Sequence, residues 1–550
     1  MSRILPLSSQ HILVSTGVGN KMVAINNSPV EDNRGERRFF DDRTLPQEVF
    51  KRMQVSAESF LVTRMDHSTL SLLALAVIVV WISQEYFSAW QRRRRPFPPG
   101  PSPYPFVGNF WDIPTKLPWL TYTKWGLQYG SDIVHASALG QHIVVVNSVK
   151  TAVEIFEKRA HMYSGRPVLT MVELMGWDFS FALLPDGDKW RDHKKCSTNI
   201  SAKIPQEFRA HLKTLVAAII MATVYGYEVQ PTNDYFVGLS EEAVKRLSDS
   251  FFPGAVVVNT FPILRYLPSW MPGADFQRFA TECCQLVKEM REAPFDFVKQ
   301  NMRDGTDSTS VVARLLESNR YDEDAIQDVA GTAYAGGADT TISSLASFFL
   351  AMALHPSIQK KAQTEIDTVI GTHRLPEFED RPSLPYVEAL YREVMRWKPV
   401  GPLGVAHAST ADDVYNGYFI PKGTTVISNI WAMTRDESIY PEPERFNPDR
   451  FFTVDGKLND DNTVLAFGFG RRICVGRHNA DATLWATFVS VLATFNIAKA
   501  KDDTGKELEI DPNFYSDSLI SNPQPFACSI IPRSETTKSL VRATMETGDF

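Results

Sequence analysis

The sequence predicts a mainly α-helical fold with a minor β portion, preceded by one N-terminal transmembrane helix. Long helical patterns dominate residues 276–397, whereas short apolar runs at 133–147 and 418–429, broken by glycine or proline, are typical of strands. No internal repeat and no long Gly/Ser tract interrupts the chain beyond residue 110. We therefore expect one large folded body over residues 111–550, although a chain of 550 residues exceeds the usual size of a single domain.

The composition argues against several classes of protein. The net charge of −7 disfavours a nucleic-acid-binding protein, which needs a basic surface for phosphate contacts. The cysteines are odd in number and scattered, so a disulfide framework is not expected and a reducing compartment fits best. No Cys-x-x-Cys pair occurs, which disfavours a structural zinc site. The cysteines are Cys196, Cys283, Cys284, Cys474 and Cys528.

Residues 1–67 form a polar N-terminal extension without sustained periodicity. Its charges would oppose transfer across a membrane, and Met65 would be a more natural initiator just before the apolar run. We therefore interpret residues 1–67 as an extended gene model or an alternative start. A mitochondrial presequence is disfavoured, because seven acidic residues precede Val62.

Residues 68–91 are predicted to be a transmembrane anchor. Residues 70–82 are apolar except for one serine, aromatic residues follow as at a membrane interface, and the arginines at 92–95 would keep the rest of the chain cytoplasmic. By length alone the apolar run also fits a signal-peptide core or a buried helix, but a cleaved signal has its positive charge before the apolar core. The basic, proline-rich residues 92–110 would form a stiff linker.

Several elements are expected within the body. Residues 133–139 and 142–147 flank a Gly-Gln pair and predict a β-hairpin, whereas residues 149–160 predict an amphipathic helix. Two short strands are expected within 418–429, around a Pro-Lys-Gly turn. The strongly apolar residues 477–494 predict the last helix.

The loop that begins at Phe467, with the sequence FGFGRRICVG, carries the strongest chemical signal. Gly468 and Gly476 allow tight turns and a close approach to a flat ligand. Cys474 precedes the predicted last helix, whose N-terminal amides and dipole would lower the thiol pKa and favour a thiolate. Arg472 would supply positive charge beside the ligand. The alternative is a buried free cysteine in a glycine-rich turn.

A second signal lies in the long helix predicted over residues 324–355, where Gly336-Gly337 is followed by Asp339 and Thr340. Two glycines inside a helix cost about 2 kcal/mol relative to alanine, so they are tolerated where the backbone opens or a ligand approaches closely. A carboxylate and a hydroxyl beside such an opening can relay protons. Alternatively, the glycines end one helix and Asp339 or Thr340 caps the next.

A third signal is the pair Glu393 and Arg396, which lie three residues apart in a helical pattern and therefore share a face. An exposed pair of this kind would contribute only about 0.2–1 kcal/mol to the stability of the protein. A buried pair would instead fix the surrounding chain, because removing one partner leaves an uncompensated charge.

These three strings resemble the signatures of the cytochrome P450 family, and the resemblance extends over residues 96–533. Phe-x-x-Gly-x-Arg-x-Cys-x-Gly is similar to the haem-binding loop, AGGADTT at 335–341 to the oxygen-activating motif, and EVMR at 393–396 to the Glu-x-x-Arg pair. The resemblance implies a cytochrome P450 fold that binds haem b, with Cys474 as the axial thiolate ligand of the iron. It also implies that Thr340 hydrogen-bonds the activated oxygen and that Asp339 delivers protons.

The resemblance assigns further residues to cofactor binding. Trp190 and Lys194 are similar to a Trp-x-x-x-Arg motif whose members contact a haem propionate. A lysine keeps the charge but loses the bidentate fork of arginine, so Arg191 or His193 could share the task. His407 is a weaker candidate for contact with a haem propionate. Alternatively, it is an ordinary polar residue of a loop.

The segment Pro443-Glu444-Arg445-Phe446 is similar to the one that adds a second arginine to the Glu-x-x-Arg pair. The resemblance thus implies a buried ionic network of Glu393, Arg396 and Arg445 that holds the loop leading to Cys474. This network would support the site structurally and would not take part in the chemistry.

The implied protein is a fungal microsomal haem-thiolate monooxygenase, a single-pass protein of the endoplasmic reticulum membrane with a cytoplasmic catalytic domain. It would insert one atom of O2 into a small apolar substrate, with electrons from NADPH through a separate NADPH-cytochrome P450 reductase, and fungal relatives favour a role in secondary metabolism. Candidate substrate contacts are Met171, Leu174, Phe179, Phe181, Ala333, Leu403, Val405, Leu519 and Ile520.

Two alternatives remain open. A haem-thiolate isomerase or dehydratase would share the cysteine loop but would need neither NADPH nor the proton relay of Asp339 and Thr340. The second alternative is an inactive copy of such an enzyme. Only about 20 residues separate Lys195 from the apolar helix predicted at 215–225, and members of the family usually have about one more helix in this stretch.

Overall fold

The computed structural model describes residues 11–14, 23–26, 79, 83 and 95–546, with gaps at 188, 191–192, 195–209, 231–232, 251–256, 307–308, 462–463 and 514. It divides into two compact units, Met1–Trp90 and Gln91–Phe550. In the first unit, strands β1 (His11–Val14) and β2 (Val23–Asn26) pair antiparallel. The predicted anchor at 68–91 lies outside the described residues except for Val79 and Ser83, which have helical backbone.

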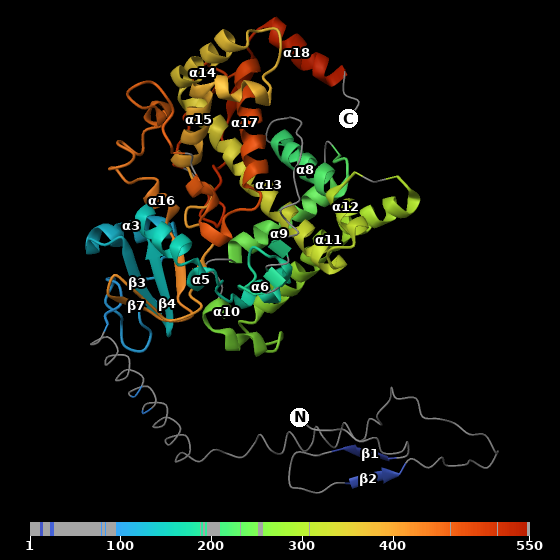
Figure 1. Cartoon of the computed structure of the whole chain (residues 1–550), viewed down its shortest axis with the longest axis vertical. Helices are drawn as coiled ribbons and strands as arrows, with labels where there is room; N and C mark the ends of the chain where they lie inside the picture. The colour runs from blue at the N-terminus through green and yellow to red at the C-terminus, as the bar shows by residue number, and fades with distance from the viewer. Residues whose placement is uncertain are drawn as a thin grey trace, which may run out of the picture. The chain divides into compact units, whose positions relative to one another are not determined.

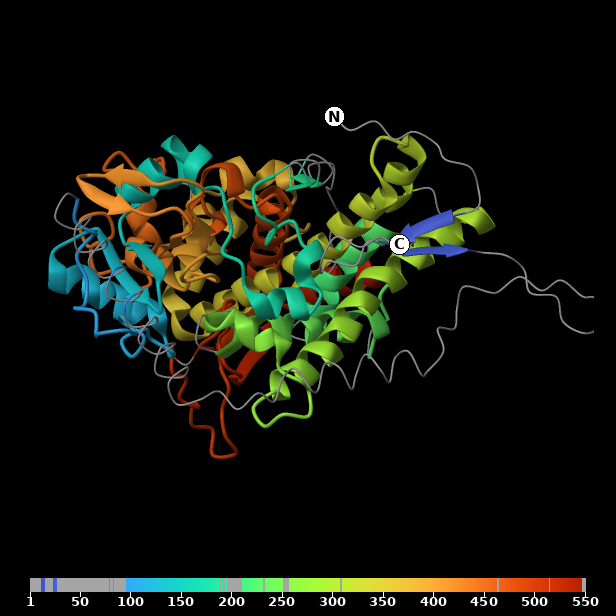
Figure 2. The ribbon, with the colours of Figure 1, turned by 90° about the horizontal axis from the view of Figure 1, so that it is seen from below.

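The second unit is mainly helical with minor sheets, as predicted. In Figure 1, α3 (Pro118–Tyr129), α16 (Ile430–Met433) and the strands β3 (Ile133–Ala138) and β4 (Gln141–Val146) lie on the left, and α8 (Ala210–Tyr225), α11 (Asp275–Asp304) and α12 (Val311–Ser318) lie on the right. In the view from below (Figure 2), the light-blue elements of residues 118–146 lie at the left end of this unit, and the yellow-green helices lie toward its right end. The long helix α13 (Glu323–Leu354) and the last long helix α17 (Arg477–Thr494) run between the two sides.

The remaining helices complete the helical side and its edges. They are α4 (Val149–Ala152), which continues as the π-helix η1 (Val153–Lys158), α5 (Ala160–Tyr163), α6 (Thr170–Leu174), α9 (Tyr235–Ser250), α10 (Val257–Thr260), α14 (Pro356–Val369), α15 (Pro385–Trp397) and α18 (Glu535–Glu546). Short 3-10 helices are η2 (Trp177–Phe179), η3 (Pro262–Tyr266), η4 (Phe378–Ser383), η5 (Pro448–Phe451), η6 (Val464–Phe467) and η7 (Gly470–Arg472).

The predicted hairpin forms one edge of a four-stranded sheet. Strands β3 (Ile133–Ala138) and β4 (Gln141–Val146) pair antiparallel around Gly140, whose φ of +82° suits the tight turn. Strand β8 (Thr425–Ser428) pairs parallel with β4, and β5 (His407–Ala408) pairs antiparallel with β8. This sheet therefore joins segments that are almost 300 residues apart in the chain.

The two strands predicted within 418–429 form but belong to different sheets. Strand β7 (Tyr418–Ile420) pairs with β6 (Asp413–Tyr415), whereas β8 joins the four-stranded sheet. A further pair, β9 (Phe495–Lys499) with β10 (Cys528–Pro532), follows α17. The short apolar runs predict strands, but their pairing depends on which distant strands they meet.

Helix α13 forms the centre of the main hydrophobic core. Among the described residues it is the one helix long and apolar enough to cross a membrane, and 72% of its apolar stretch is buried inside the protein. The helix is apolar on most sides because α8, α11, α15 and α17 all pack against it. These contacts make α13 a core helix.

Candidate active site

The cysteine loop has the tight backbone that its glycines predict. The backbone N–H of Cys474 donates to the carbonyl oxygen of Phe467 at 2.8 Å, and Gly468 has a φ of +79°. At Gly470, a Cβ would lie 2.1 Å from the carbonyl oxygen of Phe156 in the π-helix η1. Glycine at 470 is therefore required for the loop to pack against η1.

The thiol of Cys474 is exposed, at the start of α17. Its pKa is nevertheless raised, because desolvation by the surrounding protein outweighs the backbone N–H groups of Gly476 and Arg477 and the charge of Arg477. The expectation of a lowered thiol pKa is thus wrong for the protein alone, since a desolvated thiolate loses more solvation than one helix terminus returns. A bound metal cation would reverse this balance, because a coordinating thiol is deprotonated.

Three of the residues predicted to bind the cofactor lie together beside this loop. The guanidinium carbon of Arg472 lies 4.0 Å from the centre of the Trp190 ring, and Nζ of Lys194 lies 5.2 Å from it. Lys194 also donates from Nζ to the carbonyl oxygen of Arg471. Of the two residues that could share its task, Arg191 lies outside the described residues, and His193 faces Asp328 at 3.7 Å.

Arg166 is a buried cation that the sequence interpretation missed. It is 8% exposed and donates to the carbonyl oxygens of Ala182, Val405 and Ala406 at 2.7–2.9 Å. Its sequence signal is weak, because a Gly-Arg-Pro triplet in an irregular segment predicts only a turn. The residue is found only when the chain brings it beside Arg472, whose charge lowers its pKa in addition to burial.

The charges around the loop favour an anionic ligand. Burial and, to a smaller extent, the charge of Arg472 lower the pKa of Arg166 to about 9. Burial and the neighbouring arginines also lower the pKa of Lys194. Burial lowers the pKa of Arg472 to about 10, although the carboxylate of Asp186 opposes this shift. Such a group of desolvated cations is costly without anions. The carboxylates of a haem would supply them, and the accessible thiol would supply the iron ligand. The residues present therefore fit haem.

His407 is buried on β5, 7% exposed, and its Nδ1 lies 2.7 Å from the carbonyl oxygen of Tyr163. Burial and the charges of Arg166 and Arg472 lower its pKa from 6.5 to about 3. His407 thus lies on a strand and not in a loop, beside these two arginines, and its contact with a haem propionate stays a prediction.

The lowered pKa of His407 makes the haem-free protein acid-sensitive. Below pH 6.5 the unfolded chain takes up a proton that folded His407 refuses until about pH 3, so stability falls as the pH falls through this window. We expect a loss of roughly 1.5 kcal/mol between pH 6.5 and about pH 5 from this residue. Urea unfolding of the haem-free His407→Gln variant should show a shallower pH dependence by that amount, and an unchanged slope would contradict it.

The buried ionic network forms with one member different from the prediction. Glu393, 0% exposed, accepts from Nε and Nη2 of Arg396 at 2.7 and 2.9 Å. The second arginine is Arg450, whose Nε lies 3.2 Å from Glu393 and whose Nη groups donate to carbonyls at 441, 442 and 445. Arg445 is 67% exposed and pairs with Glu442 instead.

The assignment of Arg445 is therefore wrong, and the sequence contained the signal for the right residue. Pro448-Asp449-Arg450-Phe451 repeats the same proline, acid, arginine and phenylalanine order five residues later. Both strings fit the pattern, and only the fold decides which arginine reaches Glu393. The later one does, because η5 packs against α15.

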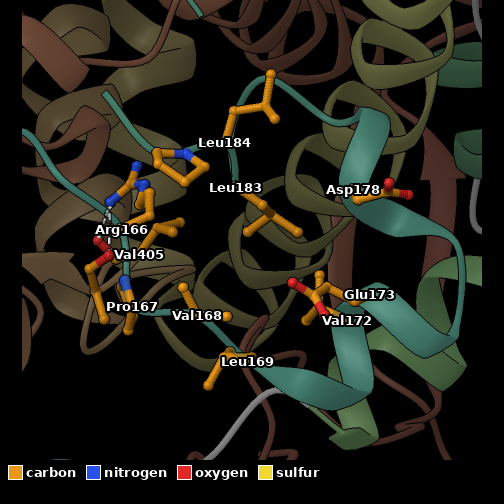
Figure 3. Close-up of a pocket in the computed structure, with 12 residues that line it drawn as sticks. Arg166, Pro167, Val168, Leu169, Val172, Glu173, Asp178, Leu183, Leu184 and Val405 are labelled. Carbon is orange, nitrogen blue, oxygen red and sulfur yellow. Dashed lines mark hydrogen bonds between the residues drawn. The ribbon is translucent and has the colours of Figure 1, made fainter. Parts of the chain in front are cut away.

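A cavity with an empty volume of about 560 Å³, including its open mouth, lies next to the cationic residues (Figure 3). Its polar lining is Arg166, Glu173 and Asp178, and the rest is apolar: Pro167, Val168, Leu169, Val172, Leu183, Leu184, Pro185, Val405 and Ala406. Of the predicted substrate contacts, Val405 lines it. Met171 and Phe179 are instead buried in the main core.

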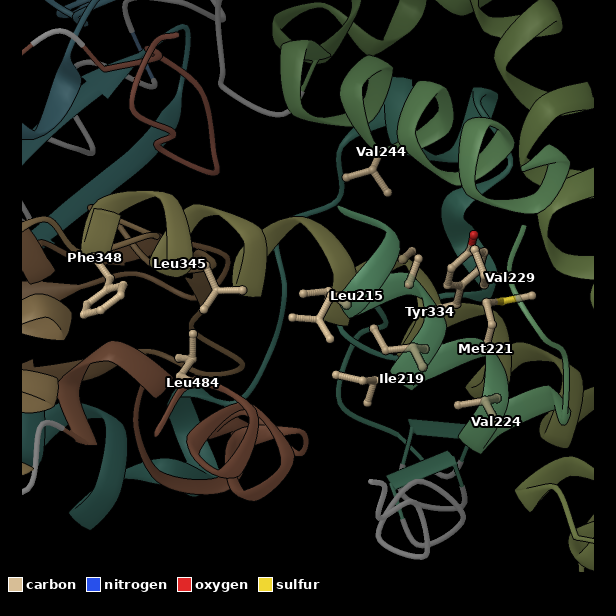
Figure 4. Packing of buried hydrophobic residues seen from close by; sticks show 14 of the residues in the cluster. Leu215, Ile219, Met221, Val224, Val229, Val244, Tyr334, Leu345, Phe348 and Leu484 are labelled. Carbon is tan, nitrogen blue, oxygen red and sulfur yellow. The ribbon is translucent and has the colours of Figure 1, made fainter. Parts of the chain in front are cut away.

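Helix α13 runs unbroken through Gly336-Gly337, so the alternative in which the glycines end a helix is wrong. A Cβ at Gly337 would lie 2.8 Å from Cδ1 of Ile220 on α8, which explains that glycine by close helix packing. Figure 4 shows the apolar side chains of α8, such as Ile219, gathered beside Tyr334 of α13. Gly336 is exposed, with nothing within 4 Å of a Cβ built there.

The two predicted catalytic residues lie on this part of α13. Oγ1 of Thr340 donates to the carbonyl oxygen of Gly336 at 2.9 Å, a bond within one helical turn. Asp339 lines a small cavity between α8, α9 and α13, together with Ser240, Glu241 and Tyr334. Asp339 thus borders this cavity, whereas Thr340 is half-buried and is not one of its lining residues, and the roles of both in proton delivery remain predictions.

Comparison with known proteins gives matches over most of the chain. A family model described as Cytochrome P450 matches residues 98–204 and 199–527. The chain is 40% identical over 506 residues to the cytochrome P450 monooxygenase ple1 of Rhodocybe pseudopiperita, which covers 86% of this chain and 96% of the relative. It is 41% identical to cytochrome P450 monooxygenase 208 of Postia placenta (86% and 98%) and 38% identical to claR of Ampulloclitocybe clavipes (86% and 93%).

The same alignments bear on the segment after Lys195. The two parts of the family match meet at 199–204, inside the stretch that we predict to be shortened. The 506 aligned positions with ple1 also exceed what 86% of a 550-residue chain can fill, so that relative has residues without a counterpart here. The predicted short segment lies outside the described residues, at 195–209.

The matches cover the two fungal monooxygenases ple1 and 208 almost from end to end. Their family binds the haem iron through a cysteine loop of the kind that lies here beside the cations Arg166, Arg472 and Lys194. Matched over most of its length both by the family model and by these relatives, the chain belongs to the cytochrome P450 family, oxidoreductases whose haem iron is ligated by a cysteine.

Proposed function

We propose that this chain is an NADPH-dependent monooxygenase that inserts one atom of O2 into a small apolar substrate, in fungal secondary metabolism. Electrons would reach the haem from NADPH through a separate NADPH-cytochrome P450 reductase. The observation that carries the proposal is the accessible thiol of Cys474 beside the desolvated cations Arg166, Arg472 and Lys194. The relatives ple1, 208 and claR support it as monooxygenases.

Different residues of the chain would bind the haem and deliver protons. When bound, the haem supplies oxygen activation, and a thiolate ligand favours cleavage of the O–O bond. Cys474 would hold the iron, while Arg472, Lys194 and Arg166 would orient the carboxylates by charge-assisted hydrogen bonds. The hydroxyl of Thr340 now donates to Gly336, so it must turn away from that carbonyl to donate a proton elsewhere. Asp339 would replace that proton.

The cavity beside Arg166 supports the proposal of an apolar substrate. Nine of its twelve lining residues are apolar, so an apolar molecule would gain most from entering it. The wall formed by 166–169 and 183–185 also lies next to Arg472, which donates to the carbonyl oxygen of Leu184 at 2.9 Å. This contact places the cavity near the proposed cofactor contacts.

We also propose attachment to the endoplasmic reticulum membrane, with a cytoplasmic body. Besides the anchor predicted at 68–91, two nearby segments expose large apolar side chains: Phe106, Trp111, Ile263, Tyr266 and Trp270 are each more than two thirds exposed. The Phe110 and Phe261 rings, 6.5 Å apart, bring the two segments together. The full chain should stay with the membrane pellet after high-salt and alkaline washing, and release by these washes would contradict attachment.

The function is tested by purifying the full chain and supplying haem, a fungal cytochrome P450 reductase and NADPH. We expect a red-shifted Soret band after reduction and binding of carbon monoxide, and NADPH-dependent oxidation of compounds that first produce a spin-state shift. Turnover without NADPH would favour the isomerase or dehydratase alternative. No haem uptake would favour an inactive copy, the alternative suggested by the short segment predicted after Lys195.

Thr340→Val tests the proton relay, with Thr341→Val as the matched control. Both hydroxyls donate to a glycine carbonyl four residues earlier, but Thr341 is buried whereas Thr340 is only half-buried. General acid catalysis typically contributes about 10²- to 10⁴-fold, so we expect product formed per NADPH to fall at least about tenfold in Thr340→Val, with hydrogen peroxide released instead. Equal effects of the two substitutions would contradict a specific role of Thr340.

A further inference from the structure

A buried carboxylate on α13 lies outside the residues assigned to the site. Asp328 is 4% exposed, and its Oδ1 accepts from Nη1 of Arg291 on α11 at 3.0 Å. Its Oδ2 lies 3.3 Å from Nζ of Lys189 and 3.7 Å from Nε2 of His193. A buried charge is costly unless it is paired, so these contacts fix all the groups involved. We call Asp328 and these three partners the Asp328 cluster.

Two members of the Asp328 cluster flank Trp190, which contacts the cysteine loop. Trp190 is 4% exposed, and the guanidinium carbon of Arg472 lies 4.0 Å from the centre of its ring. Lys194, the neighbour of His193, donates to the carbonyl oxygen of Arg471. The Asp328 cluster therefore connects α13, through the residues around Trp190, to the loop that contains the predicted iron ligand.

The surface of α13 permits this close contact. Gly331 lies almost one turn after Asp328, and a Cβ there would be 3.2 Å from Cε2 of Phe179 and 3.3 Å from Cγ of Arg291. The guanidinium carbon of Arg291 also lies 5.5 Å from the centre of the Phe179 ring. A larger side chain at 331 would push Arg291 outward, so glycine allows it to reach Asp328.

We propose that Asp328 is a positioning residue for the haem site: through Lys189 and His193 it fixes Trp190, and thereby the guanidinium of Arg472. The inference rests on the proposed function, since Trp190 and Arg472 matter as haem contacts only if the chain binds haem.

The test compares Asp328→Asn with Asp324→Asn, which removes an exposed carboxylate from the first turn of the same helix. Two rates are measured in the full chain: hydrogen–deuterium exchange of the peptide that contains 189–194 without haem, and haem transfer to excess apomyoglobin after loading. We expect Asp328→Asn to speed both, the haem loss by about 10- to 100-fold, as for groups that orient the ligands of a metal. Asp324→Asn should change neither.

Further variants separate positioning of Trp190 from a general loss of stability. His193→Gln should reproduce both effects, whereas Arg291→Gln should affect exchange in α11 more than haem loss. In a Trp190→Phe background, Asp328→Asn should no longer speed haem loss, because the residue through which it acts has been removed. If Asp328→Asn does not accumulate as folded protein, His193→Gln carries the test.

Two results would overturn the proposal. The first is that Asp328→Asn changes neither rate, like Asp324→Asn. The second is that Arg291→Gln reproduces the effects of Asp328→Asn whereas His193→Gln does not; the carboxylate of Asp328 would then fix α11 and not Trp190. A wild-type chain that takes up no haem contradicts the proposed function instead. The exchange rates of the haem-free chain would then still decide whether Asp328 fixes the segment 189–194.

Discussion

Replacing Cys474 by serine should abolish the red-shifted Soret band of the reduced, carbon-monoxide-bound protein. The serine oxygen lacks the electron donation of a thiolate, which favours O–O cleavage. We expect monooxygenase turnover to fall by at least about two orders of magnitude, equivalent to roughly 3 kcal/mol of lost transition-state stabilisation. Absorption spectra and product formation per NADPH measure the two effects.

Cys284→Ser is the matched control for this substitution. Cys284 is also exposed, but it lies on α11 and borders Gly176, away from the cysteine loop. The variant should keep the spectrum and the turnover of the wild type. A red-shifted band that survives in Cys474→Ser would show that another residue ligates the iron.

Arg450→Ala should destabilise the protein strongly, by about 3–5 kcal/mol of unfolding free energy, because it leaves the buried charge of Glu393 with one arginine fewer. It also removes the hydrogen bonds to the carbonyls of the 441–445 segment. Urea unfolding followed by circular dichroism measures the loss.

Arg445→Ala provides the comparison within the same segment. Its side chain is 67% exposed and pairs with an exposed Glu442, so the change should cost less than about 1 kcal/mol. If Arg445→Ala were the more damaging substitution, the network would include Arg445 as the sequence pattern first suggested, and the placement of Arg450 beside Glu393 would be wrong.

Local patterns predicted the elements that depend on local interactions. Helix α17 has the predicted bounds of 477–494, although α18 at 535–546, and not α17, is the last helix. The hairpin predicted at 133–147 also forms, but its turn is Leu139-Gly140 and not Gly140-Gln141, because Gln141 already pairs with Ala138. Such elements are predictable because helix periodicity and turn chemistry act over a few residues. The pairing of β7 and β8 was not predictable in the same way. Their partners β6, β4 and β5 are chosen by the fold, and the parallel pairing with β4 joins segments about 280 residues apart.

The sequence by itself predicted the chemistry of the site, since the string around Cys474 resembles the haem-binding loop of the family to which the chain belongs. Tertiary structure decided which charged groups surround that ligand. Arg166 lies in an irregular segment and Arg450 in the short 3-10 helix η5, where no periodicity predicts their contacts, and they meet Arg472 and Glu393 only after folding. It also decided the sign of the thiol pKa shift, because desolvation depends on all the atoms packed around a group and not on its neighbours in the chain.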